Sequence, residues 1–328
     1  MPNDPGLAND TCIFMEAIPG DGGTHNGNAV WWLSPDVTLR GPSSGLDEAD
    51  AGQSNPVKVK FHRKGPASGC HFPGDESITV ELWVANPSLV MAPRANSASR
   101  VGFIGAPLPA EGGTRIQQID WSPHAGLPPG NPEAGGHKCL VARCYPESGS
   151  ASDTSFFVPG DQHVVQHNLC TVPIPNQTLI FKINTLNPNP PLHLPANPLQ
   201  NSQVRLRAVL DLEPGDFVRH IVLSRLQLQS GFQQLRTAPL PQGFKFDLTG
   251  LQASQVVDHS QPGPNSFPPH TNPSFEAVIV LDTQNVTQLT FLATPRGTQP
   301  GEACIFHLTQ SDTAGKPQGG LTLLMLRV

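Results

Sequence analysis

The stretch HKCLVARCYP, residues 137–146, concentrates side chains that could bind a metal or react. It places His137, Cys139 and Cys144 within eight positions. Imidazole nitrogens and thiolates are ligands that zinc prefers. Side chains two positions apart on a β-strand share a face, so His137 and Cys139 would point the same way.

A second pair of histidines follows at His163 and His167, four positions apart and therefore also on one face of a strand. If this strand pairs with the strand at 137–146, the two sets of side chains face each other. The candidate metal ligands are then His137, Cys139, His163 and His167.

The same stretch also has the pattern of an ordinary core strand. Cys139 and Val141 would lie on one face, and Leu140, Ala142 and Cys144 on the other, so both faces are largely apolar. A tetrahedral site would need a twist or bulge, and free cysteines are commonly buried in cores. We interpret the stretch as a core strand and expect no cofactor. The metal question stays open until the strand pairing is known.

Catalytic motifs do not single out an active site in the sequence. It contains no CxxC, and short Asp–His pairs such as Asp161/His163 occur by chance. A triad is defined by its geometry, so a hydrolase or a metal-dependent enzyme on a β-sandwich scaffold remains the alternative. We assign no catalytic residue and expect no enzyme.

Composition narrows the class of protein. The 328 residues are 37% hydrophobic and 14% charged, with 36 Pro and 31 Gly scattered without a period. So many prolines and glycines favour short strands and turns over long helices. The net charge of −6 and the missing basic cluster argue against nucleic-acid binding. No run of 18 apolar residues occurs, so we expect no membrane span.

The N-terminal residues 1–29 are rich in Gly, Asn and Asp and predict a flexible arm. They lack the basic region and apolar core of a signal peptide, and the initial Met favours synthesis in the cytoplasm, with particle association or non-classical export as the later route. The six cysteines are irregularly spaced, so we expect reduced, partly buried thiols. A bridge from Cys139 to Cys170, or from Cys70 to Cys144, stays open.

Alternating apolar residues predict strands at 55–65 and 77–88, where Ile78, Val80, Leu82 and Val84 oppose Thr79, Glu81 and Trp83. Further strands are expected in two sets. The first comprises 29–41, 114–123, 137–146 and 162–174. The second comprises 179–185, 202–212, 219–229, 244–250, 275–283, 286–295, 303–312 and 319–328, and its last two form a hairpin. Prolines at 172–180 mark the boundary.

Three tryptophans are candidates for a binding surface. Trp31 and Trp32 are adjacent, so on a strand they would point to opposite faces, and Trp83 opposes the apolar face of its strand. Exposed tryptophan often anchors protein partners. The same residues could serve a carbohydrate-binding module, so a glycan partner is a further alternative.

Residues 30–174 resemble bacterial Ig-like modules of the CARDB type. The resemblance rests on the order of WWLSPDVTLRG, NPVKVKFHRKG, ITVELWVANPS, Trp121-Ser122-Pro123, GHKCLVARCYP and QHNLCTV. It implies a β-sandwich with a binding or structural role and carries over no catalytic residue. The long insertions and the second set of strands depart from the family pattern.

The sequence as a whole predicts an all-β protein with a flexible arm (1–29) and two tandem Ig-like antiparallel β-sandwiches (30–174 and 175–328). The expected function is non-catalytic: a structural, adhesive or assembly protein of a filament, particle or surface assembly. Its expected partners are proteins or further copies of itself.

Overall fold

The structure, a computed structural model, describes most of the N-terminal half of the chain and the strands of the C-terminal half. The described residues are 4–25, 30–91, 98–128, 131–152, 156, 158, 160–174, 179–185, 203–211, 214–221, 236–237, 256–259, 274–281, 287–293 and 302–327. Nearly all regular structure in them is β, and most strand pairs are antiparallel. The predicted all-β class is confirmed.

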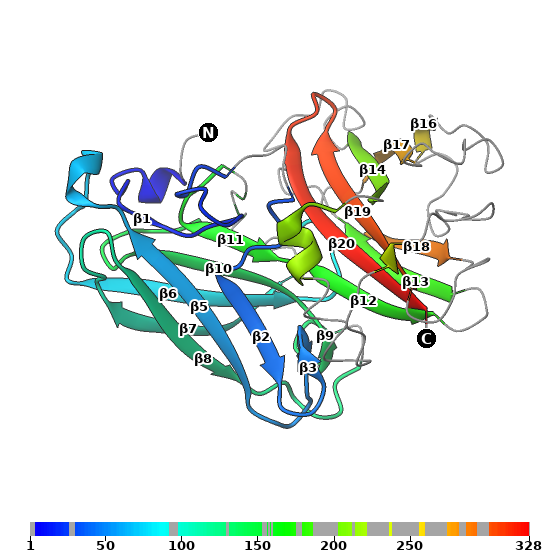
Figure 1. Ribbon diagram of the computed structural model, residues 1–328, viewed down its shortest axis with the longest axis horizontal. Helices are drawn as coiled ribbons and strands as arrows, with labels where there is room; N and C mark the ends of the chain where they lie inside the picture. Colours follow the sequence, from blue (N-terminus) through cyan, green and yellow to red (C-terminus); the bar gives the residue numbers. More distant parts are fainter. Residues whose placement is uncertain are drawn as a thin grey trace, which may run out of the picture. The chain divides into compact units, whose positions relative to one another are not determined.

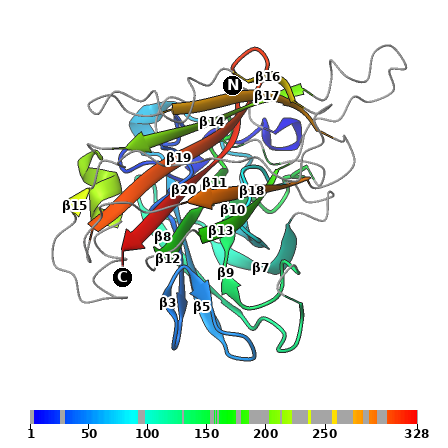
Figure 2. The same ribbon diagram turned by 90° about the vertical axis from the view of Figure 1, so that its right-hand side faces the viewer.

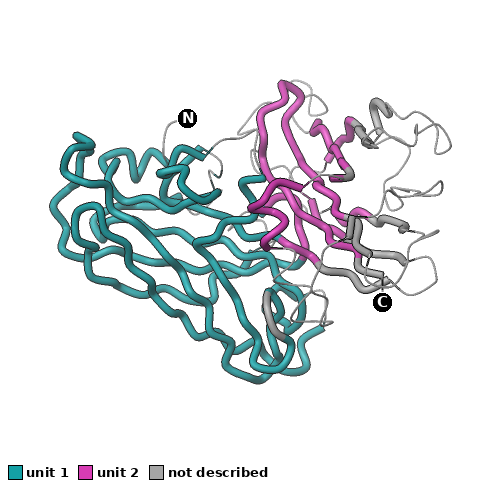
Figure 3. The backbone as a smooth tube through the Cα atoms, viewed as in Figure 1, with its two compact units in different colours: residues 1–86, 91–168 teal, residues 87–90, 169–328 magenta. Residues whose placement is uncertain are grey.

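The chain divides into two compact units (Figure 3). Unit 1 comprises residues 1–86 and 91–168, and unit 2 comprises 87–90 and 169–328. The boundary therefore falls before the prolines at 172–180. The run at 162–174 is two strands, β11 (Val164–His167) in unit 1 and β12 (Leu169–Ile174) in unit 2.

Unit 1 contains two main sheets, whose strands cross in Figure 1. The first is built around β5 (Asn55–Arg63), which pairs with β1 (Ile13–Phe14), β2 (Val37–Gly41) and β8 (Thr114–Trp121); β3 (Gly45–Leu46) extends β2. The second has the order β11, β10 (Cys139–Pro146), β6 (Ser77–Ala85), β7 (Ser99–Pro107). A small ladder joins β4 (Glu48–Ala49) to β9 (Gly136–His137).

The core of unit 1 lies between these sheets. The apolar alternation predicted for β5 and β6 is confirmed, because Val57, Val59 and Phe61, like Ile78, Val80, Leu82 and Val84, are fully buried. Gly102 on β7 faces Ile119 on β8 so closely that an added Cβ would lie 2.4 Å from the Ile119 side chain. Strand β10 is buried along its whole length, as predicted for a strand covered on both faces.

The N-terminal segment is not a free arm, which corrects the sequence-based prediction. Among residues 4–25, Leu7, Cys12, Ile13, Met15 and Ala17 are buried, and β1 pairs with the end of β5. Gln162 also holds this segment. Its side-chain amide donates to the Ile13 carbonyl (2.6 Å), and its backbone carbonyl accepts from the Met15 N–H (2.9 Å). These apolar residues are too few and too irregularly spaced to predict a strand from the sequence.

A disulfide between Cys12 and Cys70 fixes the same segment. The expectation of reduced thiols is therefore wrong for these two residues, and neither bridge left open by the sequence is the one that forms. Cys139 and Cys144 carry buried thiols outside any disulfide, and the thiol of Cys170 is half-buried.

We expect Cys12→Ser to lower the free energy of unfolding by about 2–4 kcal/mol, because it releases a long closed loop in the unfolded chain. The bridged residues are 58 positions apart. Chemical denaturation with and without a reductant measures the effect. Cys170→Ser is the matched control and should change stability little; a reductant that leaves the unaltered protein's midpoint in place would contradict the prediction.

Unit 2 is described through its strands (Figure 2). Its main sheet has the order β12, β20 (Pro317–Arg327), β19 (Glu302–Asp312), β14 (Gln203–Asp211), β17 (Ser274–Val280), β16 (Val256–His259), and β15 (Arg236–Thr237) pairs with β19. A second ladder joins β13 (Leu179–Thr185) to β18 (Thr287–Ala293). The predicted C-terminal hairpin is confirmed as β19–β20.

One predicted strand of unit 2 begins as a helix. Residues 216–221 are helical, and the Arg219 N–H donates to the Gly215 carbonyl (2.9 Å). Pro214-Gly215 thus starts a helix instead of preceding a strand at 219–229, of which 222–229 lie outside the described residues. The strand expected at 244–250 also lies outside them. That unit 2 is a second Ig-like sandwich stays a prediction.

Candidate functional site

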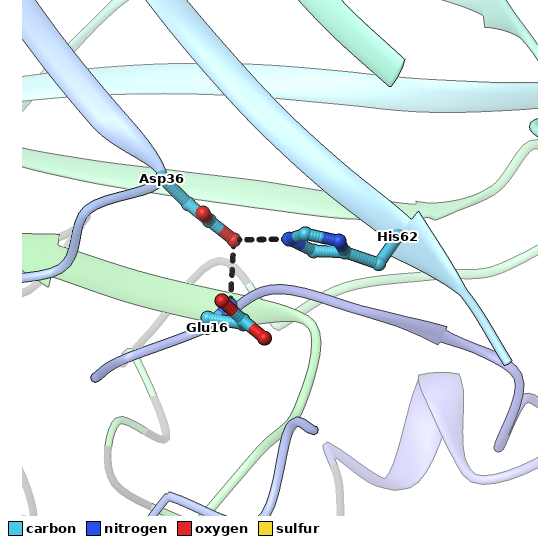
Figure 4. Close-up of side chains that lie close together, drawn as sticks. All are labelled: Glu16, Asp36 and His62. Carbon is cyan, nitrogen blue, oxygen red and sulfur yellow. Dashed lines mark hydrogen bonds and ion pairs between the residues drawn. The ribbon is translucent and has the colours of Figure 1, made fainter. Parts of the chain in front are cut away.

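Glu16, Asp36 and His62 come together on the side of β5 that faces away from the core (Figure 4). Their ligand atoms lie within 4.8 Å of one another, and no other group of three such residues does so in the part of the chain that the structure describes. Carboxylates and imidazole are the donor types of a divalent-cation site. None of the three was a candidate from the sequence.

The Asp36 carboxylate is already neutralised by protein groups. Its Oδ2 accepts from the Glu16 N–H (2.6 Å) and lies 3.0 Å from His62 Nε2, while Oδ1 lies 2.7 Å from Lys60 Nζ. The Lys60 ammonium thus provides the positive charge that a cation would bring. The donor set resembles a cation site, but its contacts are those of a buried carboxylate that joins β1, β2 and β5.

His62 also contacts a hydroxyl. Its Nδ1 lies 2.9 Å from Thr114 Oγ1, so Asp36, His62 and Thr114 form the acid–base–hydroxyl order of a nucleophilic triad. However, His62 and Thr114 are cross-strand neighbours in the β5–β8 register, so the contact follows from strand pairing. Such chemistry also needs donors for an oxyanion, and the N–H of the adjacent Gly113 is used within its turn by the Ala110 carbonyl (2.8 Å).

His163 lies between two buried carboxylates. Its Nδ1 is 2.7 Å from Asp161 Oδ1, its Nε2 is 3.0 Å from Asp10 Oδ2, and its side chain is fully buried. Burial by itself would lower the pKa of His163, but hydrogen bonds and charges from Asp10 and Asp161 raise it to about 9. His163 is therefore a structural cation that ties the N-terminal segment to the start of β11.

The four candidate metal ligands do not share a site. His167 directs Nδ1 to the Ser34 carbonyl (2.9 Å) and Nε2 to Asp47 Oδ1 (3.2 Å), and it lies opposite Leu140 in the β10–β11 register. The Cys139 thiol lies on the other face and donates to Asn168 Oδ1. His137 lies on β9 with Glu48 Oε1 3.8 Å from its Nδ1.

Cys144 is not a candidate nucleophile either. Burial raises the pKa of its thiol well above the ordinary value, and the negative charges of Asp36 and Glu81 raise it further. A buried thiol kept protonated in this way is unreactive.

The two adjacent tryptophans are buried, which corrects their interpretation as interface residues. Trp31 is 1% and Trp32 4% exposed, and their rings meet edge to face with centroids 5.5 Å apart. They lie in a turn that precedes β2, so the strand alternation that would expose one of them does not apply.

Trp83 alone of the three candidates reaches the surface. It lies half-buried on the outer face of the β6–β7–β10 sheet, within what we call the outer-face cluster. This cluster consists of Glu81, Trp83, Arg100, Phe103, Arg143 and Phe156.

The charged centre of the outer-face cluster is Glu81, which is 4% exposed. Its Oε2 accepts from Arg143 Nε (2.8 Å) and Nη2 (2.6 Å), and its Oε1 accepts from Arg100 Nη1 (3.1 Å). Burial would raise the pKa of Glu81, but the charge and hydrogen bonds of Arg143, with smaller contributions from Trp83 and Arg100, hold it below its ordinary value.

Aromatic rings stack around the two guanidinium groups. Arg143 Cζ lies 5.6 Å from the Trp83 ring centre and 5.4 Å from that of Phe156, and Arg100 Cζ lies 5.8 Å from Trp83 and 5.3 Å from Phe103. These are cation–π distances. The inner half of the cluster is buried, whereas Phe103 is 68% exposed and the Arg100 side chain 49% exposed. The cluster can hold an arginine and an aromatic ring in fixed positions at the surface.

Trp83 is the one member of this cluster that the sequence marked as a binding candidate, and the strand that carries Arg100 and Phe103 was not predicted. The opposition of Trp83 to the apolar face of β6 was the available signal. Arg100 and Phe103 lie on β7, whose alternation is hidden by Gly102 and Gly105 and by a register shift opposite Leu82–Trp83.

Comparison with known proteins does not identify a family. No protein-family model and no curated protein matches the sequence. The collagen adhesin of S. aureus is 9% identical over 89% of this chain and 92% of its own, with a TM-score of 0.22. The CupB6 tip adhesin of Pseudomonas aeruginosa is 9% identical over 90% of this chain and 97% of its own, with a TM-score of 0.17. Scores this low establish no shared fold and support no function.

Proposed function

We propose that this protein is a non-catalytic assembly protein that associates with other protein subunits through the outer-face cluster of unit 1. The observation that carries the proposal is the exposure of Phe103 beside an Arg100 guanidinium held over Trp83. Trp and Arg are enriched among residues that dominate binding energy, and aromatic residues are enriched at interfaces generally. A fixed arginine loses little conformational entropy when a partner binds.

The clusters that resemble catalytic or metal sites have structural roles in this proposal. Asp36 and His163 each have their charges compensated by neighbouring protein groups, and both clusters connect the N-terminal segment to the sandwich. In the described residues, no helix is long and apolar enough to cross a membrane.

A carbohydrate-binding role has less support. Sugars stack on an open aromatic face, but Arg100 and Arg143 both lie within stacking distance of the Trp83 ring. Trp31 and Trp32 are buried. The proposal therefore assigns the surface to protein partners.

We expect the purified protein to self-associate as its concentration rises, which sedimentation velocity measures directly. The expected result is a concentration-dependent increase in the average mass, with little dependence on chelators. A strict monomer up to the solubility limit would contradict the proposal. Stoichiometric zinc that is lost on His62→Ala, or turnover of ester substrates that is lost on Thr114→Val, would instead establish the enzyme alternative.

A further inference from the structure

Strand β7 forms the edge of its sheet, and the middle of this strand lacks the charged residues that usually protect an edge. In the part of the chain that the structure describes, β7 pairs only with β6. Natural proteins usually protect such edges with charges, prolines or bulges, because an open edge can pair with another strand. Here a bulge at Val101 and the ring of Pro107 protect the two ends, and the five residues Gly102–Ala106 between them carry no charge.

The hydrogen-bonding pattern shows which backbone groups face outward. The Leu108 N–H donates to the Glu76 carbonyl (3.1 Å), and this pair continues the β6–β7 register. Bonded and non-bonded pairs alternate in an antiparallel ladder, so Ala106, Ile104 and Gly102 bond to β6. The N–H and C=O groups of Phe103 and Gly105 therefore point away from the sheet.

The side chains along this edge suit an identical strand. Phe103 is 68% exposed and Ile104 37% exposed. If two copies of β7 pair antiparallel about Ile104, each Phe103 lies opposite a Gly105, which leaves room for the ring. Aromatic–glycine pairs of this kind stabilise sheets. Each such pair also satisfies the outward backbone groups of both residues.

Charge favours the same orientation. Arg100 lies at one end of β7, and Asp75, Glu76 and Glu147 lie near the other end. Antiparallel pairing places the basic end of one copy against the acidic end of its partner. Parallel pairing would align like charges.

We propose that the partner at this edge is a second copy of the chain, bound by antiparallel pairing of β7 with its symmetry mate about Ile104. The resulting sheet is continuous through both subunits, and the outer-face clusters of the two copies lie on the same side of it. This inference rests on the proposed assembly function and adds the partner, the strand and the register.

Strand β8, the edge of the other sheet of unit 1, offers matched controls. Ile116 on β8 is 59% exposed, more than Ile104 on β7 at 37%. Unlike the middle of β7, β8 carries charged residues, Arg115 and Asp120. A cysteine at position 104 would face its own copy in a non-hydrogen-bonded pair, where Cα atoms approach within about 4.5 Å and a disulfide can close. A cysteine at position 116 would have no such neighbour.

The experiment compares Ile104→Cys with Ile116→Cys under mild oxidation, followed by non-reducing electrophoresis. We expect a covalent dimer from Ile104→Cys and at least tenfold less from Ile116→Cys. In sedimentation, Ile104→Lys should weaken dimerisation at least tenfold, whereas Gln118→Lys on β8 should leave it unchanged, with thermal unfolding confirming that each variant is folded.

Two other outcomes would overturn the inference in different ways. If the protein oligomerises but Ile104→Lys does not weaken it and Ile104→Cys gives no cross-link, the β7 interface is wrong while the assembly function stands. If the unaltered protein is a monomer at every concentration and Ile104→Cys does not cross-link, both proposals are wrong.

Discussion

Replacing His163 by glutamine is expected to destabilise unit 1 by about 3–5 kcal/mol, the usual cost of removing one partner from a buried ionic cluster. The side chain is fully buried between Asp10 and Asp161. Glutamine keeps hydrogen-bonding capacity but removes the positive charge that lies between the two buried carboxylates. Thermal unfolding should show a midpoint lower by roughly 10 °C.

The pH dependence of stability tests the same cluster. The pKa of His163 is raised from an ordinary 6.5 to about 9 in the folded protein. A group with a raised folded pKa stabilises the protein fully below its unfolded pKa, and this contribution is lost as the pH rises through the folded value. About 3 kcal/mol should therefore disappear between pH 6.5 and 9, a loss that His163→Gln cannot show.

Lys138 acts in the opposite direction and must be separated from this effect. It is almost fully buried and donates to Asn86 Oδ1 (2.8 Å), and burial lowers its pKa to about 8. A lowered lysine pKa makes the folded state more favourable as the pH rises from about 8 toward the unfolded value. The quantity to measure is thus the difference between the unaltered protein and His163→Gln at each pH, because Lys138 contributes equally to both.

Two variants distinguish charge from packing at this site. Adding Asp10→Asn to His163→Gln removes one of the two buried negative charges and should recover part of the lost stability. His137→Gln is the matched control, since this half-buried histidine lies 3.8 Å from Glu48 Oε1, and the substitution should cost less than about 1 kcal/mol. A His163→Gln variant as stable as the His137→Gln control would show that the charge of His163 is unimportant.

His163 also illustrates what the sequence could and could not predict about the candidate sites. Its residue type marked it as chemically interesting, and Asp161, two positions away, was visible as a neighbour. Asp10 was not, because it is 153 positions away and belongs to a segment without strand alternation. The likeness to zinc ligands came from local spacing, whereas the true partners come from tertiary contacts.

Fold prediction succeeded where one face of a strand is buried and the other is not. In β5 and β6 this difference produces a period of two that the sequence displays directly. It failed at β7, where Gly102 takes the place of a core side chain and Phe103 points to solvent. It also failed at Trp31 and Trp32, since their burial depends on a turn. The Cys12–Cys70 pairing could not be found, because six cysteines allow many pairings and spacing does not select one.

The outer-face cluster should respond to substitution according to the burial of each arginine. Glu81→Gln removes the negative charge that Arg143 and Arg100 share, and Arg143, which is 4% exposed, keeps a buried positive charge. We expect a loss of about 3–5 kcal/mol in the free energy of unfolding at neutral pH. Because the pKa of Glu81 is lowered in the folded protein, its contribution should vanish as the pH falls through that value, and the difference between variant and parent should shrink.

The control for this prediction uses the other arginine on the same carboxylate. The Arg100 side chain is 49% exposed, so Arg100→Gln should cost no more than about 1 kcal/mol, as for other surface pairs. Replacing the buried pair together, as Glu81→Leu with Arg143→Met, should recover most of the loss because no charge is left buried. Denaturant unfolding of the three variants measures these differences. If Glu81→Gln costs no more than Arg100→Gln, Arg143 does not depend on Glu81, and the rigid support that the cluster gives to the exposed Arg100 and Phe103 is absent.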